Sequence, residues 1–402
     1  MIPYLLCDDP VIRHQLLPLT FTRPVAHLRV GITTIEEKWR DFAGEHAGFI
    51  TADYLQTAFG ASLGKENLLI NASFVPDAEL VEAVRVLESG TVLEKDGHWI
   101  ACRCTEAETA GFRPEICLSD RKRCEYPHDC LQIRHPWDLF IHNGKQIGRD
   151  LARIAQKRKS APLLGEGIRQ WGAYPVFAEE NAQVMQAMID TTEGPVYLGR
   201  NTKVMPGAII QGPLALCEGS LIKMGAKIYG GNTFGPYCKV AGEVENTVMI
   251  GYSNKAHDGF LGDAVLGEWC NLGAGTNCSN LKNDYSPVKM WSYAEERFVP
   301  TGLQFCGLLM GDHSKSAIGT QFNTGTVVGV GANVFGAGFP KNFIPSFTWG
   351  KETYRVERAL ETAAIVYARR NRNFGQTEAE ILRAVYRLSA GNREKSQAEQ
   401  RI

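Results

Sequence analysis

The chain has 402 residues, 44% of them hydrophobic, and 43 Lys and Arg against 44 Asp and Glu give a net charge of −1. This length suggests two or three domains, and the apolar fraction excludes a wholly disordered chain. The balanced charge gives no reason to expect a nucleic-acid partner, and no apolar run is long enough to span a membrane. The 11 cysteines have no zinc-like spacing, and no basic region precedes an apolar run at the N-terminus. We therefore expect reduced thiols, no bound metal at the cysteines, no signal peptide and a cytoplasmic location.

Residues 1–190 alternate short apolar runs with amphipathic segments. Residues 49–52 and 67–72 predict buried strands, and residues 76–87 predict a helix with Pro and acidic residues in its first turn. Residues 137–154 predict a further helix. Strands that alternate with helices favour an α/β sheet, so we expect an α/β domain over residues 1–190.

Residues 191–347 carry a six-residue repeat, and 25 of the 41 glycines lie between Gly194 and Gly338. Neither a helix, with a period of 3.6, nor a strand, with a period of 2, explains this spacing, whereas a parallel β-helix does. A Gly-rich β-sandwich is the alternative, but an unbroken run in one register favours the β-helix. In each unit the large apolar residue is expected to point inward. These residues are Leu198, Val204, Ile210, Leu216, Ile222, Ile228, Phe234 and Val240.

The repeat is interrupted twice. The register slips by two after Val240 and resumes at Val248. Residues 283–303 lack the repeat and predict a loop that leaves the coil, and the repeat returns at Ile318. Cys238 and Cys270 fall on small inward positions and are expected to lie in the core.

Residues 348–402 predict a tail of two amphipathic helices, with a break at residues 371–375. We expect this tail to cap the open end of the β-helix, because the last coil otherwise exposes unpaired edge groups. A basic run, residues 369–372, lies between the two helices. Most such runs are solvated surfaces, and a phosphate contact is the sharper alternative.

Two segments resemble a known family. Residues 253–276 contain His, then Gly-Asp-Ala, then Asn-x-Gly-Ala-Gly-Thr. This segment resembles the acetyltransferase core of the bifunctional N-acetylglucosamine-1-phosphate uridylyltransferase/glucosamine-1-phosphate acetyltransferase family. Residues 16–24 are similar to the Pro-Leu-Thr stretch of sugar nucleotidyltransferases. The resemblance implies a divergent, short member of that family, in which an α/β nucleotidyltransferase-like domain precedes a left-handed β-helix.

The resemblance implies acetyl transfer from acetyl-CoA to an amino-sugar phosphate. It places His257 as the base that takes the proton of the attacking amine, a role that suits a group with a pKa near neutrality. Asn271 and Ala274 would lie on neighbouring coils, with Ala274 leaving room for the pantetheine arm. Thr320 matches a residue near the thioester. His313 is a second candidate base, and His257 could also be simply solvated.

Three further residues would contact the sugar phosphate. The resemblance places Phe260 where the family has Tyr, and Asn280 matches an Asn of the sugar site. Leu281 replaces the Tyr that should follow it, so the acceptor pocket is less polar than the family's. Lys255 could hold the phosphate of the sugar or of a nucleotide.

The N-terminal domain departs from the family pattern. Asp8 and Asp9 stand where the family has a glycine-rich phosphate loop, and they place negative charge where an anion has to dock. Arg13 and Arg23 could neutralise part of the phosphate charge, and Mg²⁺ would be needed for nucleotidyl transfer. The domain could therefore be active or could retain the fold without the chemistry.

Three hypotheses follow. The first is the acetyl-CoA-dependent acyltransferase. The second is an active transferase that joins UTP or dTTP to a sugar 1-phosphate. The third is a non-catalytic protein that binds a sugar nucleotide. In each case the partner is a small sugar phosphate or sugar nucleotide, and the resemblance implies a homotrimer.

Overall fold

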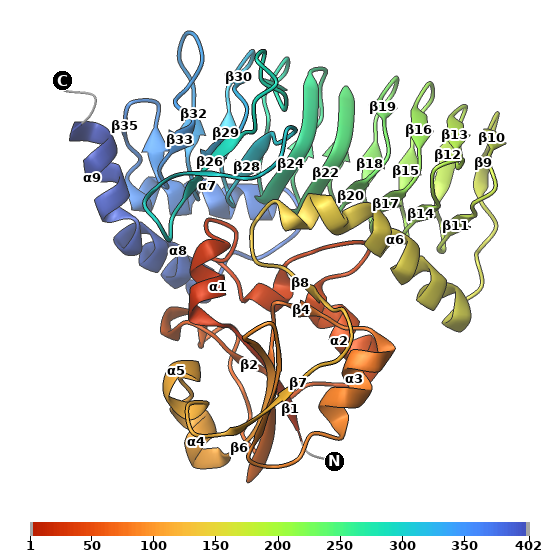
Figure 1. The fold of residues 1–402 in the computed structure, drawn as a ribbon. Coiled ribbons are helices and arrows are strands. Elements are labelled where there is room, and N and C mark those ends of the chain that lie inside the picture. Colours follow the sequence, from red (N-terminus) through yellow and green to blue (C-terminus); the bar gives the residue numbers. More distant parts are fainter. Residues whose placement is uncertain (1–2, 399–402) are drawn as a thin grey trace. The chain divides into compact units, whose positions relative to one another are not determined.

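The computed structural model describes residues 3–398, which form two compact units. The first unit comprises residues 3–28 and 33–135, and the second comprises residues 29–32 and 136–398. Figure 1 shows the first unit in red to orange and the coils of the second in yellow-green to blue. Among the described residues, no helix has the length and apolar character needed to cross a membrane.

The first unit contains a mixed six-stranded sheet in the order β2-β1-β3-β6-β5-β7. Strand β1 is a fully buried run that pairs in parallel with β2 and β3, as expected for an α/β domain. Strand β6 is antiparallel to β3 and β5, and β7 is parallel to β5. The strands are β1 (Tyr4–Cys7), β2 (Phe49–Ile50), β3 (Glu66–Asn71), β5 (Thr91–Lys95), β6 (His98–Thr105) and β7 (Lys122–Glu125).

Short helices and one small hairpin complete the first unit. Thr34 begins α2 with a capping box, and Asp77 caps α3, so polar side chains satisfy the first amides of both helices. The predicted strands at 49–52 and 67–72 and the predicted helix at 76–87 are confirmed. The elements are α1 (Pro10–Gln15), η1 (Val25–His27), α2 (Ile35–Ala43), η2 (Asp53–Leu55), β4 (Phe74–Val75), α3 (Ala78–Arg85), α4 (Glu106–Ala110), α5 (Pro114–Cys117) and β8 (Leu131–Gln132).

The second unit is a parallel β-helix with three ladders of short strands. On the first ladder each strand pairs with the strand one coil later, and single bridges at Asn271 carry the ladder across one coil. All eight predicted inward residues from Leu198 to Val240 are buried, so this prediction is confirmed. The first ladder consists of β9 (Leu164–Glu166), β12 (Gln183–Met185), β15 (Lys203–Val204), β18 (Leu221–Ile222), β21 (Lys239–Val240), β23 (Asn254–Lys255), β29 (Lys315–Ser316), β32 (Asn333–Val334) and β34 (Thr348–Trp349).

The other two ladders share the long strands β22 and β24, which each span two sides of the coil. The second ladder consists of β10 (Arg169–Trp171), β13 (Met188–Asp190), β16 (Ile209–Gln211), β19 (Lys227–Ile228), β22 (Glu243–Gly251), β24 (Phe260–Glu268), β25 (Asn277–Cys278) and β30 (Gln321–Phe322). The third adds β11 (Val176–Ala178), β14 (Val196–Leu198), β17 (Leu214–Leu216), β20 (Asn232–Phe234), β28 (Leu308–Met310), β31 (Thr326–Val328) and β33 (Phe343–Ile344).

The coils begin before residue 191, since β9 to β13 already pair with later strands. The long helix α6 (Asp138–Lys157) matches the predicted helix at 137–154 and belongs to this unit. Asn143 on α6 accepts hydrogen bonds from the amide of Gly31 (2.7 Å) and the hydroxyl of Thr233 (3.0 Å). This side chain therefore ties α6 and residues 29–32 to the third ladder.

The segment predicted to leave the coil contains an antiparallel hairpin, β26 (Lys289–Ser292) and β27 (Arg297–Pro300). After the last coil, β35 (Glu352–Thr353) leads into helices α7 (Val356–Ala368), α8 (Gln376–Leu388) and α9 (Ala390–Ala398). Tyr367 of α7 stacks on Trp269, with ring centroids 3.9 Å apart. The prediction that the tail caps the end of the coil is therefore incomplete, because α7 also runs back along the first ladder (Figure 1).

Candidate functional site

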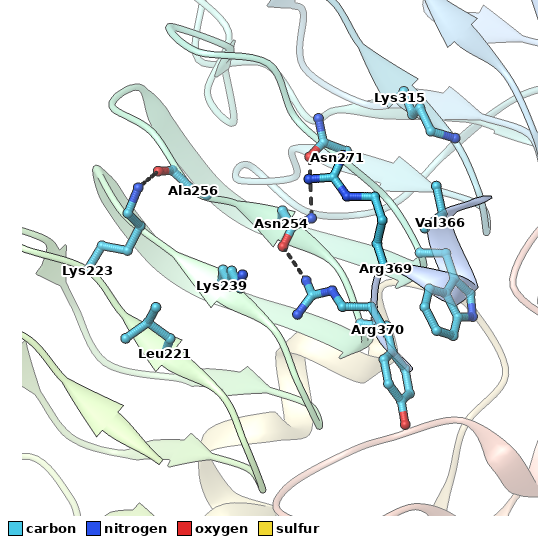
Figure 2. A pocket seen from close by; sticks show the side chains of 12 residues that line it. Leu221, Lys223, Lys239, Asn254, Ala256, Asn271, Lys315, Val366, Arg369 and Arg370 are labelled. Carbon is cyan, nitrogen blue, oxygen red and sulfur yellow. Dashed lines mark hydrogen bonds between the residues drawn. The ribbon is translucent and has the colours of Figure 1, made fainter. Parts of the chain in front are cut away.

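A pocket of about 640 Å³ lies on the first ladder of the β-helix, where the end of α7 meets the coils. Figure 2 shows its lining side chains, which come from five consecutive coils and from α7. The lining residues are Leu221, Lys223, Lys239, Tyr252, Asn254, Ala256, Trp269, Asn271, Lys315, Val366, Arg369 and Arg370.

None of the described lining residues is acidic, and five are cationic. The cationic residues are Lys223, Lys239, Lys315, Arg369 and Arg370. Burial lowers the pKa of Lys239, and the positive charges of Arg370, Arg369 and Lys223 lower it further. Burial also lowers the pKa of Lys315. The repulsion between these like charges decreases when an anion binds between them, so the pocket favours a phosphate-bearing ligand.

Hydrogen bonds connect α7 to the floor of the pocket. Arg370 donates from Nη2 to Oδ1 of Asn254 at 2.8 Å, and Asn254 donates from Nδ2 to Oδ1 of Asn271 at 3.3 Å (Figure 2). Lys223 donates to the carbonyl of Ala256 at 3.0 Å. These contacts place Arg370 of the tail beside Asn254, which lies 116 residues earlier in the chain.

An aromatic column at one corner of the coil holds α7 in place. Tyr237, Tyr252, Trp269 and His313 follow one another on successive coils, and all four have positive φ. Tyr252 and Trp269 stack with centroids 4.3 Å apart, and Tyr367 stacks on the same indole. The stacking and burial of these rings compensate for the strain of the left-handed backbone.

Two of the predicted acyl-transfer residues lie in or beside the pocket, and a third lies in the neighbouring corner. Asn271 lines the pocket, and His257 is an exposed residue directly after Ala256, which also lines it. Ala274 occupies the corresponding corner one coil later, where its carbonyl accepts the amide of Gly319 at 2.8 Å. Residues 256–259 form the corner between β23 on the first ladder and β24 on the second, so His257 lies where the two ladders meet.

Phe260 and Asn280 lie together on the second ladder instead. A Cβ atom added at Gly262 would be 2.6 Å from the Phe260 ring and 2.8 Å from Nδ2 of Asn280, so both side chains pack against this glycine. Asn280 donates to Asp263 at 2.7 Å, and Asn246 donates to the other oxygen of the same carboxylate at 2.7 Å. Burial raises the pKa of Asp263, while the two amide hydrogen bonds oppose this shift.

The remaining predicted residues of the β-helix are less accessible. Thr320 is buried, and its hydroxyl donates to the carbonyl of Ala317 at 2.9 Å. Lys255 points into the coil with 2% exposure and donates to the carbonyl of His257 at 2.5 Å. The second candidate base, His313, is half-buried in the aromatic column, 6.4 Å from the Trp269 ring.

The three lysines of the pocket were not among the predicted site residues. Lys239 and Lys315 occupy outward positions of the first ladder, in the same row as Asn254 and Asn271. The six-residue repeat could have placed them in one row. The basic run at residues 369–372 was a second signal, and its contact with the coil supports the phosphate alternative.

In the first unit, the residues that follow β1 are engaged with the chain itself. Arg13 pairs with Asp8 at 3.2 Å and donates to the hydroxyl of Tyr54 at 2.8 Å. Asp8 also accepts the hydroxyl of Thr51 at 2.6 Å, and burial raises its pKa. The second predicted arginine, Arg23, is buried with 5% exposure.

Asp9 occupies the start of α1. Its Oδ1 accepts the amides of Val11 (3.0 Å) and Ile12 (3.1 Å), and its Oδ2 accepts the indole N–H of Trp99 at 2.8 Å. These amides are the donors that a phosphate loop would offer to a nucleotide. Asp8 is buried and paired with Arg13, and Asp9 caps α1, so these two acids do not fit a Mg²⁺ site. Over residues 3–398, no group of three or more His, Cys, Asp or Glu could hold a metal ion.

Comparison with known proteins gives two kinds of similarity. Residues 4–159 match the family model described as sugar nucleotidyl transferase. A protein of Escherichia coli K12 named as an uncharacterized acetyltransferase, YaiX, is 30% identical over 163 residues, which cover 37% of this chain and 66% of YaiX. The bifunctional protein GlmU of Bartonella quintana is 29% identical over 260 residues, which cover 58% of this chain and 54% of that protein.

A third relative, the bifunctional protein GlmU of Methanocaldococcus jannaschii, is 28% identical over 127 residues, covering 32% of this chain and 26% of that protein. The chain thus spans just under two thirds of YaiX and about half or less of these two GlmU proteins. The nucleotidyl transferase model falls mainly on the first unit and extends through α6.

Proposed function

We propose that the β-helix of this GlmU-like chain transfers an acetyl group from acetyl-CoA to the amine of an amino-sugar phosphate. The relatives support a role in sugar-nucleotide biosynthesis, and acetyl transfer is the specific reaction that we propose within that role. The observation that carries it is the cationic pocket on the first ladder, which adjoins the corner with His257.

The pocket suits the phosphates of acetyl-CoA. Coenzyme A carries a diphosphate and a 3′-phosphate, and arginine and lysine are the side chains that bind such groups most strongly. The five cationic side chains face no carboxylate within the described lining. Bound here, the phosphates would leave the pantetheine arm free to pass Asn271 and Ala274 towards the corner.

The exposed imidazole of His257 supplies the proton chemistry. The amine nitrogen attacks the thioester carbon, the C–S bond breaks, and the CoA thiolate leaves. His257 takes the proton that the amine loses, which is the usual role of a general base near neutral pH. The Gly-rich corners of neighbouring coils offer backbone N–H groups of the kind that stabilise the oxyanion.

The acceptor would approach from the other side of the corner. Phe260 and Asn280 lie on the second ladder, whereas the cationic pocket lies on the first. An amine bound by these two residues and a thioester extending from the pocket would converge on His257. The ring of Phe260 has no hydroxyl, which favours a less polar sugar than glucosamine 1-phosphate.

The proposed assembly is a homotrimer. On the second ladder Met188 and Ile209 are paired neighbours with exposures of 41% and 50%. Two adjacent exposed apolar side chains on a flat side are stabilised when a second copy covers them. Sedimentation equilibrium would test this assembly.

Nucleotidyl transfer from UTP or dTTP is the second candidate function, because residues 4–159 match the sugar nucleotidyl transferase model. The geometry favours it less, since Asp9 fills the amides at the start of α1. The non-catalytic sugar-nucleotide-binding protein is the remaining alternative.

Mass spectrometry of the full chain with acetyl-CoA and a panel of amino-sugar phosphates tests the proposal. UTP, dTTP and Mg²⁺ are included, and His257→Ala is the matched control. A sugar phosphate carrying an added acetyl group, absent with the variant, is expected. A sugar nucleotide would favour the second function, and no product with any acceptor would contradict both enzymatic functions.

A further inference from the structure

The corner that carries His257 differs from the regular corners of the coil. In three of those corners, the carbonyl two residues after the inward residue accepts the amide of a glycine one coil later. Gly207 donates to Gln186 (2.8 Å), Gly225 to Pro206 (3.1 Å) and Gly319 to Ala274 (2.8 Å).

At the corner after Lys255, the corresponding carbonyl belongs to His257. The glycine of the next coil, Gly275, donates instead to Asp258 at 3.1 Å, one residue further along. The shift leaves the carbonyl of His257 without the backbone donor that the carbonyls of Gln186, Pro206 and Ala274 have. The ammonium of Lys255 takes that place at 2.5 Å.

Lys255 reaches this carbonyl from inside the coil. It pairs in register with Val240, and the same inward row contains Val204 and Ile222. With 2% exposure it lies where these three earlier coils have a buried apolar side chain. Burying a cation is costly, so the lysine needs a compensating interaction at this position.

The preceding corner provides the space for this side chain, because it is two residues short. Glu243 follows Val240 by three residues, whereas Lys227 follows Ile222 by five, although Lys227 and Glu243 are direct partners on the second ladder. A Cβ atom at Gly242 would lie 2.9 Å from Nζ of Lys255. The missing residues therefore leave a gap that the lysine fills.

Every carbonyl of residues 256–259 consequently accepts a hydrogen bond. Lys223 donates to Ala256 at 3.0 Å, Gly275 donates to Asp258, and Glu243 donates to Gly259 at 3.2 Å. With Lys255 on His257, four consecutive carbonyls accept hydrogen bonds. Burial lowers the pKa of Lys255 to about 8, and Asp258 opposes this shift. Both the ammonium and the neutral amine can donate this hydrogen bond.

We infer that Lys255 is a positioning residue, which replaces the missing backbone donor and fixes the corner so that His257 faces the meeting point of the two ladders. The inference rests on the proposed acetyl transfer for its kinetic part only. Lys255 does not touch the substrate in this role, so its effect is on the orientation of the base.

Lys255→Met in the full chain removes the donor and retains an unbranched side chain. We expect kcat for acetyl transfer to fall at least tenfold, KM for acetyl-CoA to stay within twofold, and the melting temperature not to fall. Ser220→Ala is the control, because it removes a buried hydrogen bond to Gly235 in a corner without histidine. It should lower stability and leave kcat unchanged.

A second variant guards against misfolding. It combines Lys255→Val with a methionine inserted before Gly242 and an alanine after it, which copies the regular corner at residues 223–227. This chain should fold at least as stably as the native protein and still lose at least tenfold in kcat. Native kcat in either folded lysine variant would overturn the inference.

Amide hydrogen exchange of residues 256–259 separates this inference from the proposed function, since it needs no substrate. In Lys255→Met we expect these amides to exchange at least tenfold faster, with the other coils unchanged. Unchanged exchange would overturn the inference even if the native chain transferred acetyl groups. Faster exchange in a chain without acetyl transfer would contradict the proposed function and leave Lys255 as the residue that fixes the corner.

Discussion

Arg370 gives the sharpest test of the cationic pocket. It is half-buried, belongs to the tail, and is held over the first ladder by its hydrogen bond to Asn254. Arg370→Gln removes the charge but retains a polar side chain that can still reach the asparagine. We expect weaker binding of acetyl-CoA, because one of five cations that face the phosphates is lost.

The size of the effect follows from the environment of the arginine. A hydrogen bond to a charged group contributes about 1.5–3 kcal/mol when it is shielded from water. The pocket opens to solvent and four cations remain, so the lower end applies, at about 1.5 kcal/mol. This corresponds to about a tenfold higher Kd, and the difference should shrink as ionic strength rises.

Calorimetric titration with CoA measures Kd directly. Steady-state kinetics then compare acetyl-CoA with acetyl-pantetheine, which lacks the adenosine and all the phosphates. The variant should raise KM for acetyl-CoA and leave KM for acetyl-pantetheine unchanged. Arg358→Gln on the same helix is the matched control, because Arg358 is exposed and pairs with Glu361 at 3.0 Å. Equal effects on both donors, or an unchanged Kd, would refute the reasoning.

Three further predictions concern the base, the first unit and its pH dependence. His257→Ala should abolish acetyl transfer while sedimentation shows an unchanged oligomer, and retained activity would remove His257 as the base. With UTP and Mg²⁺ we expect weak or absent pyrophosphate release, and turnover near ~10 s⁻¹ would contradict the role given to Asp9. Burial between Phe49 and Phe59 lowers the pKa of His27 to about 4. The folded chain therefore favours the neutral imidazole, and the free energy of unfolding is highest above pH 6.5 and decreases as pH falls towards 4. From pH 7 to 5, urea titrations should therefore show the native chain losing about 2 kcal/mol more unfolding free energy than His27→Leu.

The sequence predicted the coils well because each inward residue is specified locally by its position in the repeat. It predicted the pocket poorly, because the pocket depends on where α7 packs. Arg370 and Asn254 are 116 residues apart, and contacts such as the stacking of Tyr367 on Trp269 bring them together. No spacing in the chain encodes that contact. The basic run was visible, but its partner was not.

The residues taken from the family resemblance divide in the same way. His257, Asn271 and Ala274 follow the repeat, and they lie in or beside the pocket or in a neighbouring corner. Lys255 was expected to hold a phosphate, and its role there stays a prediction that its burial inside the coil does not favour. The direction of a side chain at an interrupted repeat depends on the space that the previous coil leaves, which spacing alone does not give.

The interruption itself was visible in the sequence as a register slip of two after Val240. The coils before and after the slip bury their inward side chains. A corner that is two residues shorter leaves a gap, and van der Waals contacts are lost unless another side chain fills it. The filler is a cation, and it reaches the carbonyl of the one exposed histidine in that corner. The break in the repeat and the fixed position of His257 thus follow from one local rearrangement. In other β-helices of this kind, a register slip one coil before a histidine predicts a corner whose backbone is held so as to orient that histidine.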